Sequence, residues 1–206
     1  MAALRVKVCG MSQSDNIQAL AKLEIDYMGF IFYKGSKRYV AAPKIADIPA
    51  SINKVAVFVN PSFAEVQARI QEGFNSIQLH GDESVEFCRQ VKAEGISLIK
   101  AFGIQDAVDW QQLADYLEVV DYFLFDTSSA AYGGTGKVFN WSLLQAYPYE
   151  KAYFLSGGLD LLNIPDALAL ESSKLVGLDL NSKFEISPGL KNIEKIKQAL
   201  KIIKDE

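Results

Sequence analysis

The stretch "LRVKVCGMSQSDNIQALAKL", residues 4–23, contains one complete strand-and-helix unit, and repetition of this unit decides the fold. Apolar and charged residues alternate up to Val8, which is typical of a β-strand. Cys9 and Gly10 end the strand, and the apolar positions beyond them lie three and four residues apart, as on one face of a helix. The unit therefore places a thiol at a strand tip, where the backbone turns toward a helix.

Seven further β-branched or aromatic runs follow at intervals of roughly 25 residues, and amphipathic segments separate most of them. Several of these segments end in glycine, as helices often do. We expect only a short helix at residues 43–48, "PKIADI", and a delayed one after the sixth run. The pattern predicts a single α/β domain over residues 1–206, a (β/α)8 TIM barrel, with an open doubly wound sheet as the alternative. The expected strands are "LRVKVC", "DYMGFIF", "KVAVFV", "NSIQLH", "SLIKAF", "YFLFD", "AYFLS" and "LVGLDL".

The composition is that of a soluble globular protein, with 50% hydrophobic and 22% charged residues. The net charge of −4 gives no electrostatic reason to expect nucleic acid or an anionic membrane as partner, and no apolar run is long enough to cross a bilayer. Cys9 and Cys88 lie far apart without a pairing pattern, which predicts a reduced, cytoplasmic setting. Because His80 is the single histidine, several imidazoles cannot share a metal within one chain, and we expect no metal.

In such a barrel the active site lies at the carboxyl ends of the strands. Those ends bring a thiol, an imidazole, two carboxyl groups and a pair of glycines to one rim. Each residue alone is equally well explained as a polar group that meets solvent, so their joint occurrence is what points to a site. The residues at the predicted strand ends are Cys9, Phe32, Asn60, His80, Phe102, Asp126, Ser156, Gly157, Gly158 and Asp179.

Two loops at this rim have features that suit anions. Gly157 and Gly158 let backbone amides approach an anion, and the loops after strands seven and eight are the usual phosphate site of this fold, although a tight turn would also explain the glycines. After the second strand, Lys37 and Arg38 supply positive charge, and a guanidinium suits bidentate binding of a carboxylate. The Gly-rich loop that begins at Asp126 has the length of an active-site lid, or is a plain solvated loop.

Cys9 and Asp126 belong to the first and sixth strands, which should face each other across the mouth of the barrel. A base on one side and an acid on the other suit proton removal coupled to proton donation. The start of the following helix would lower the pKa of the Cys9 thiol, whereas partial burial would keep Asp126 protonated. The rim therefore predicts an acid–base site for a small phosphorylated molecule.

Strand parity places Arg5, Lys7 and Cys9 inside the barrel. A buried lysine needs a carboxylate partner, and Asp126 and Asp179 are the candidates. Two roles stay open for Lys7: it helps to set the protonation of the rim, or it only anchors the core of the barrel.

Seven segments, taken in order, carry a resemblance to one enzyme family. They are "KVCGM", "GFIFYKGSKRYV", "VAVFVN", "IQLHGDE", "FDTSSAAYGGTGKVFNW", "LSGGL" and "GLDLNSKFEISPGLKN". Together they cover nearly the whole chain, and in combination they are specific, whereas "SGG" alone would be a weak signal. The sequence resembles the phosphoribosylanthranilate isomerases.

The resemblance implies an Amadori rearrangement in tryptophan biosynthesis, without metal or organic cofactor. N-(5-phosphoribosyl)anthranilate becomes 1-(2-carboxyphenylamino)-1-deoxyribulose 5-phosphate. Asp126 is implied as the general acid that protonates the furanose ring oxygen, and Cys9 as the general base that takes the proton from C2. Arg38 falls where the family holds the anthranilate carboxylate. Further implied substrate-binding residues are His80, Gly157, Gly158 and Asp179.

One loop departs from the family pattern. Where the family usually has a sequence resembling "SSGVE", residues 181–185 read "NSKFE". Ser182 is retained as a donor, but Lys183 replaces a glycine and restricts the backbone. We expect the ammonium of Lys183 to compensate, so that this loop still binds the phosphate.

Two other classes of function stay open. One is a different phosphosugar barrel enzyme, but metal-dependent epimerases need more histidines than His80, and dual-specificity isomerases typically have a carboxylate where this chain has Cys9. The other is a non-catalytic barrel that binds a phosphorylated ligand, which would need neither Cys9 nor Asp126. In each case the expected partner is a small phosphorylated molecule, and the chain is a monomer or a homodimer.

Overall fold

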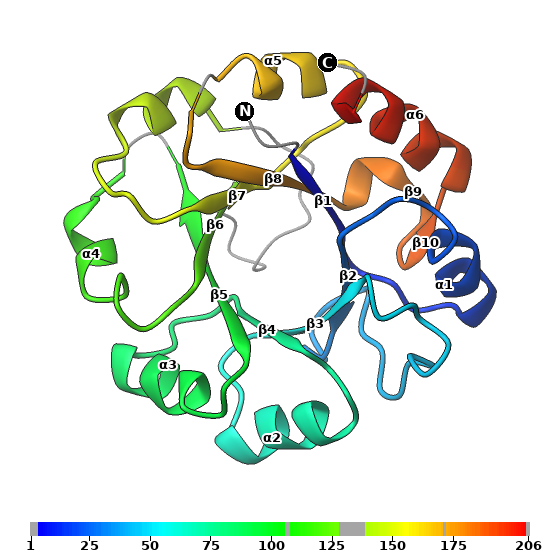
Figure 1. Cartoon of the computed structure of the whole chain (residues 1–206), viewed down its shortest axis with the longest axis horizontal. Helices are drawn as coiled ribbons and strands as arrows, with labels where there is room; N and C mark the ends of the chain where they lie inside the picture. The colour runs from blue at the N-terminus through cyan, green and yellow to red at the C-terminus, as the bar shows by residue number, and fades with distance from the viewer. Residues whose placement is uncertain (1–3, 106–107, 128–138, 171, 205–206) are drawn as a thin grey trace.

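The computed structural model describes residues 4–105, 108–127, 139–170 and 172–204. Eight parallel strands pair in chain order and close into a barrel, because β1 pairs with both β2 and β8. Figure 1 looks into this ring and shows the helices outside it. The predicted (β/α)8 barrel is confirmed, and the open sheet is wrong. The strands are β1 (Arg5–Val8), β2 (Tyr27–Ile31), β3 (Asn53–Phe58), β4 (Ser76–Leu79), β5 (Ser97–Ile104), β6 (Tyr122–Thr127), β7 (Tyr153–Leu155) and β8 (Leu175–Leu180).

Local capping residues define where two of the outer helices begin. Ser62 and Glu65 form a reciprocal capping box at the start of α2, and the Ser84 side chain accepts a hydrogen bond from the Phe87 N–H at the start of α3. Within the described ranges, no helix is both long and apolar enough to cross a membrane. The helices are α1 (Ser14–Leu20), α2 (Phe63–Gln71), α3 (Val85–Lys92), α4 (Gln111–Ala114), α5 (Ile164–Leu168) and α6 (Ile193–Lys204), with 3₁₀ helices at Trp141–Ala146 and Ser182–Phe184.

The helix expected at residues 43–48 is absent, and the segment between β2 and β3 forms turns instead. Pro43 and Pro49 border this stretch, and the few residues between them are too short a span to offset the cost of helix nucleation. Ile48 still packs into the core, and its N–H donates to the Ile45 carbonyl in a turn.

Strand parity divides the interior into two apolar clusters. Val6 and Val8 of β1 belong to the large cluster between the barrel and its helices, whereas Cys9 belongs to a smaller cluster enclosed by the strands. The predicted alternation along β1 is therefore confirmed. The enclosed cluster consists of Cys9, Tyr27, Val55, Val57, Ile99, Ala101, Leu124 and Phe154.

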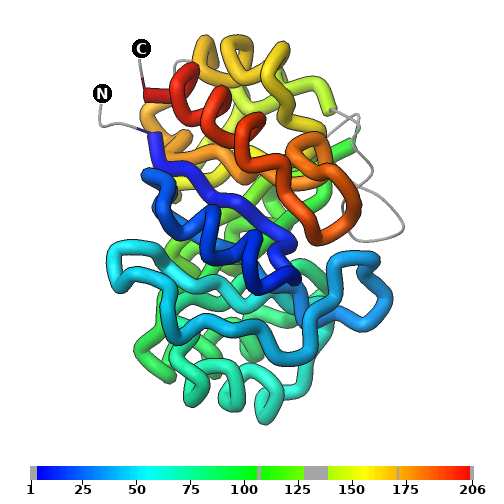
Figure 2. The backbone as a smooth tube through the Cα atoms, turned by 90° about the vertical axis from the view of Figure 1, so that its right-hand side faces the viewer, coloured from blue at the N-terminus to red at the C-terminus, as the bar shows by residue number. Residues whose placement is uncertain are grey.

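The two ends of the barrel differ in what they carry. Figure 2 shows the start of β1 and the end of α6 at one end, and the loops after β2 and β8 projecting from the other. The loop after β8 contains a small antiparallel hairpin of β9 (Glu185–Ser187) and β10 (Leu190–Lys191). Because all eight strands run the same way, their carboxyl ends meet at the end where these loops project.

Candidate active site

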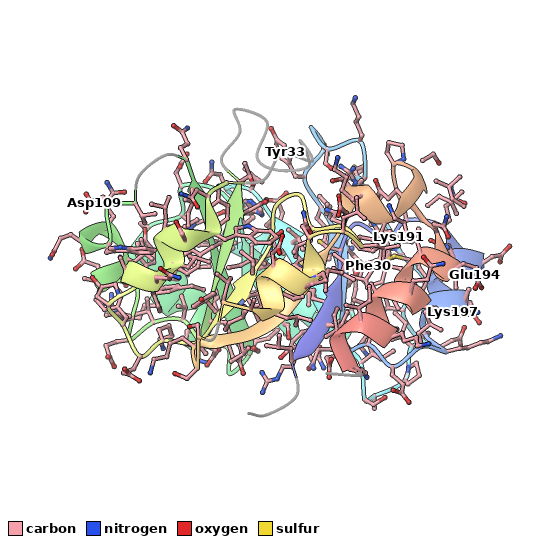
Figure 3. The ribbon with its side chains drawn as sticks, turned by 90° about the horizontal axis from the view of Figure 1, so that it is seen from above. Phe30, Tyr33, Asp109, Lys191, Glu194 and Lys197 are labelled. Carbon is pink, nitrogen blue, oxygen red and sulfur yellow. The ribbon has the colours of Figure 1, made fainter. Side chains whose placement is uncertain are left out.

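A cavity of about 370 Å³ is lined by residues from the carboxyl ends of the strands. This volume is of the size that holds a small organic ligand. Tyr33 forms part of its wall, and Figure 3 shows Tyr33 at this end of the barrel. Of the predicted site residues, the cavity brings together Cys9, Arg38, His80, Asp126 and Asp179.

Cys9 follows β1 directly, and the neighbouring strand makes room for its sulfur. Its N–H donates to the Leu180 carbonyl at 3.0 Å, and a Cβ built on Gly29 would lie 2.7 Å from Sγ. Burial raises the pKa of the Cys9 thiol above its ordinary value, although the ammonium of Lys7 opposes this. The prediction that the N-terminus of the following helix lowers the thiol pKa is therefore wrong, because α1 begins only at Ser14 and desolvation is the larger effect.

Lys7 and Asp179 form an ion pair inside the barrel, next to Cys9. Nζ of Lys7 donates to Oδ2 of Asp179 at 2.9 Å, and both side chains are buried. Burial opposes the charge on Lys7, but Asp179 and Cys9 hold the pKa of its ammonium above the ordinary value. Of the two carboxylates considered as partners, the structure pairs Lys7 with Asp179. A fixed positive charge thus lies between a thiol and a carboxylate.

Asp126 lies near the end of β6 and is 7% exposed. Burial, with a smaller contribution from the charge of Asp179, raises the pKa of its carboxyl group to about 7. The Thr127 N–H donates to Oδ1 at 2.8 Å and partly opposes this shift. The expectation that burial favours the protonated form of Asp126 is confirmed, so this carboxyl group can donate a proton near neutral pH.

His80 contacts Asp126 as a neutral imidazole. Its Nε2 lies 3.5 Å from Oδ2 of Asp126, and burial together with the charges of Lys100 and Lys7 lowers the His80 pKa to about 4. Gln78 lies two residues earlier and faces the same way, with its Nε2 3.2 Å from Nδ1 of His80. When Gln78 donates to Nδ1, the ring proton resides on Nε2 and points toward Asp126. Sequence reasoning missed Gln78, although strand parity had placed it beside His80.

Arg38 reaches the cavity while paired with a residue that the sequence did not single out. Its Nε lies 2.9 Å from Oε1 of Glu185, and its Nη2 lies 2.7 Å from Oε2. Nζ of the buried Lys191 donates to Oε1 of the same carboxylate at 2.6 Å. The β9–β10 hairpin brings Glu185 and Lys191 together, and the spacing of the two residues in the chain gives no signal of this contact.

The residues predicted to bind phosphate lie beside the cavity lining. Gly157 and Gly158 both have positive φ, 87° and 71°, and a Cβ on Gly157 would lie 2.6 Å from the backbone nitrogen of Thr127, so glycine is required there. Ser182 and Lys183 belong to a 3₁₀ turn, and Lys183 is exposed. The described cavity lining contains their neighbours Ser156 and Asn181 but none of these four residues.

The predicted lid lies largely outside the described residues. The loop that begins at Asp126 is described at its two ends, and residues 128–138 between them are not described, so the lid stays a prediction. In the ranges that the structure does cover, no group of three or more His, Cys, Asp or Glu side chains is arranged to hold a metal ion.

Comparisons with known proteins agree on one family. The family model for N-(5'phosphoribosyl)anthranilate (PRA) isomerase matches residues 6–202. The N-(5'-phosphoribosyl)anthranilate isomerase of Phocaeicola vulgatus is 44% identical over 189 residues, which are 91% of each chain.

Two solved structures extend this agreement to the fold. Phosphoribosyl anthranilate isomerase from Thermotoga maritima superposes with a TM-score of 0.85 at 33% identity, covering 98% of this chain and all of that one. A phosphoribosyl anthranilate isomerase in complex with reduced 1-(o-carboxyphenylamino)-1-deoxyribulose 5-phosphate superposes with a TM-score of 0.83 at 31% identity. The superposition covers 98% of this chain and 100% of that one. With a family model matched along nearly its full length, this chain belongs to the N-(5′-phosphoribosyl)anthranilate isomerase family.

Proposed function

We propose that this enzyme converts N-(5-phosphoribosyl)anthranilate to 1-(2-carboxyphenylamino)-1-deoxyribulose 5-phosphate, the Amadori rearrangement of tryptophan biosynthesis. The observation that carries the proposal is that a thiol and a carboxyl group from β1 and β6, Cys9 and Asp126, line one cavity. The complex of a family member with the reduced product supports this substrate class.

In the first step, Asp126 donates its proton to the furanose ring oxygen. The bond between C1 and that oxygen breaks, and the nitrogen lone pair forms the C1–N double bond of a protonated Schiff base. Cys9, as thiolate, then takes the proton from C2, and those electrons form the enolamine. Transfer of a proton to C1 and loss of the hydroxyl proton at C2 give the ketone, so no oxidant or reductant is needed. The pKa of about 7 for Asp126 supports the first role.

The protonation states predict the shape of the pH profile. Turnover needs Asp126 protonated and Cys9 ionised, yet the pKa of Asp126 is about 7 and the pKa of the Cys9 thiol is raised above its ordinary value. Only a minor fraction of molecules carries both correct states, and this fraction is constant between the two pKa values. We therefore expect kcat/KM to rise with pH up to about 7, to stay level, and to fall beyond the pKa of the thiol.

Lys7 has a defined place in this scheme as a positioning residue that stabilises the thiolate. Lys7→Met removes the ammonium that lowers the thiol pKa. We expect the plateau of kcat/KM to fall roughly tenfold for each unit by which the thiol pKa rises, with the alkaline limb moving to higher pH. Lys7→Arg keeps the charge and should retain most of the activity. A pH–rate profile unchanged in Lys7→Met would remove Lys7 from the mechanism.

The remaining roles concern binding. We assign the anthranilate carboxylate to Arg38, which combines a guanidinium with a place in the cavity wall. His80 and Asp179 contact the substrate at the same rim. The phosphate is assigned to the loops after β7 and β8, where positive φ at Gly157 and Gly158 lets amides approach an anion. Whether the chain is a monomer or a homodimer stays a prediction.

Lys183 provides a test of the phosphate assignment. We expect Lys183→Met, which removes the charge and leaves the backbone restricted, to raise KM roughly two- to fivefold, because an exposed ion pair is weak. Lys183→Gly restores backbone freedom and should raise KM as well if the charge compensates for the missing glycine. A KM that stays the same or falls in Lys183→Gly would refute the compensation.

The proposed function is tested by following anthranilate-type fluorescence after freshly made phosphoribosylanthranilate is added to the purified protein. We expect a decay much faster than the spontaneous breakdown of the substrate, and formation of the ketone product. A decay no faster than the spontaneous breakdown would overturn the proposal.

A further inference from the structure

Glu185 is the centre of a buried ionic cluster behind the cavity wall. Its carboxylate binds Arg38 through Nε and Nη2, with an Nη2–Oε2 distance of 2.7 Å. It also accepts hydrogen bonds from Nζ of Lys191 at 2.6 Å and from the Gly189 N–H at 3.1 Å. The Glu185 side chain is 5% exposed and the Arg38 side chain 12%. A carboxylate held by so many donors leaves Arg38 little freedom to turn away.

Lys191 is anchored from two sides and has no exposed surface on its side chain. Its backbone N–H and carbonyl exchange hydrogen bonds with the side chain of Asn16 in α1, at 2.7 and 2.9 Å. Its Nζ donates to Oδ1 of Asn181 at 2.7 Å as well as to Glu185. Asn181 in turn lines the cavity. The cluster thus connects an outer helix to the wall of the cavity.

The arrangement of charges follows from these contacts. Glu185 pairs with both Arg38 and Lys191. Burial lowers the pKa of the Lys191 ammonium to about 8, so at neutral pH it keeps its charge and the cluster has a net charge of +1. Glu185 occupies the Nε and Nη2 edge of the guanidinium, while Nη1 has no hydrogen-bond partner among the described residues. Arg38 contributes to the cavity wall, so the net positive charge of the cluster lies at the cavity.

We infer that Glu185 and Lys191 are positioning residues that aim Arg38 at the aromatic carboxylate of the substrate and keep its positive charge available. This inference rests on the proposed function. Glu185 fixes the direction of the guanidinium. Lys191 neutralises Glu185, which would otherwise cancel the charge of Arg38 and repel a second carboxylate at short range.

The experiment compares two ligands on four proteins. The ligands are reduced 1-(o-carboxyphenylamino)-1-deoxyribulose 5-phosphate and its analogue without the ring carboxyl group. The proteins are wild type, Glu185→Gln, Lys191→Met and the double variant, and Kd is measured by calorimetric titration. Dividing the two Kd values isolates the contribution of the carboxylate, because both ligands share the sugar phosphate.

We expect Lys191→Met to weaken binding of the carboxylated ligand roughly tenfold or more, with little change for the other ligand. Glu185→Gln should weaken binding of the carboxylated ligand less, because Arg38 loses its direction while the cluster gains net positive charge, which partly offsets that loss. The double variant should bind the carboxylated ligand more tightly than Lys191→Met, because the uncompensated carboxylate is gone. A merely structural role predicts equal losses for both ligands and no such recovery, and that result would overturn the inference.

Two neighbouring residues supply a matched control. Glu194 and Lys197 form an exposed ion pair on α6, on the outer side in Figure 3, whereas Lys191 lies closer to the barrel. Glu194→Gln and Lys197→Met should leave both Kd values unchanged. If Lys191→Met fails to fold, the near-isosteric Glu185→Gln is tested alone. Equal effects of this substitution on the Kd values of both ligands would refute the positioning role of Glu185 and Lys191. If the wild type turns over the substrate but the variants leave the ratio of the two Kd values unchanged, this inference is refuted and the proposed function stands.

Discussion

Cys9→Ala is expected to lower kcat by roughly 10²- to 10⁴-fold while the Kd of the reduced product changes little. The thiol is the only group assigned to remove the proton from C2, and its loss leaves no other base in that role. The side chain lies at the cavity wall, so its truncation removes little binding surface. Stopped-flow turnover and calorimetric titration of the same preparation measure the two effects separately.

The second cysteine is a matched control for this variant. Cys88 is buried too, but it lies in α3 and does not line the cavity, and burial raises the pKa of its thiol to about 11. Cys88→Ala should lower the stability as other core truncations do and leave kcat near the wild-type value. A Cys9→Ala protein that keeps its turnover would refute the role of Cys9 as the general base. Weaker binding of the reduced product without a loss of kcat would favour a ligand-binding role for the thiol.

Asp126→Asn should lower kcat by a similar factor, because an amide cannot donate a proton to the ring oxygen. The substitution keeps the oxygen that accepts from the Thr127 N–H, so the strand end should keep its geometry. Asp121→Asn serves as the comparison, since Asp121 precedes β6 at the opposite end of the barrel and pairs with Lys92. That variant should retain its turnover, and an Asp126→Asn enzyme with wild-type kcat would exclude Asp126 as the acid.

The same variant has a second, independent readout in stability. Burial raises the pKa of Asp126 from 3.8 to about 7, so its contribution to stability is full below pH 4 and is lost as the pH rises through 7. Asp126→Asn has no such titration. As the pH rises from 4 to 8, the unfolding free energy of Asp126→Asn should therefore increase relative to that of the wild type, by up to about 4 kcal/mol. Urea unfolding at both pH values measures this difference, and a constant difference would contradict the raised pKa.

Much of the fold and part of the rim could be predicted because they depend on short-range periodicity. The strand-and-helix repeat predicted the barrel, and the alternation along β1 placed Lys7 and Cys9 inside it. The shared direction of the strands then explains why Asp126 and Cys9 meet at one cavity. The helix at residues 43–48 was predicted wrongly, because apolar spacing there was outweighed by the two bordering prolines.

The sequence by itself determined the architecture and which residue types reach the open end of the barrel, since strand period and chain direction are local properties of the backbone. Tertiary structure alone decided which charges pair there: Lys7 with Asp179, and Arg38 with Glu185 and Lys191. It also decided that the pKa of the Cys9 thiol rises, where the sequence had predicted a lower value. The physical reason is that ion pairing and desolvation depend on distances and burial among residues far apart in the chain, and these exist only once the barrel has closed.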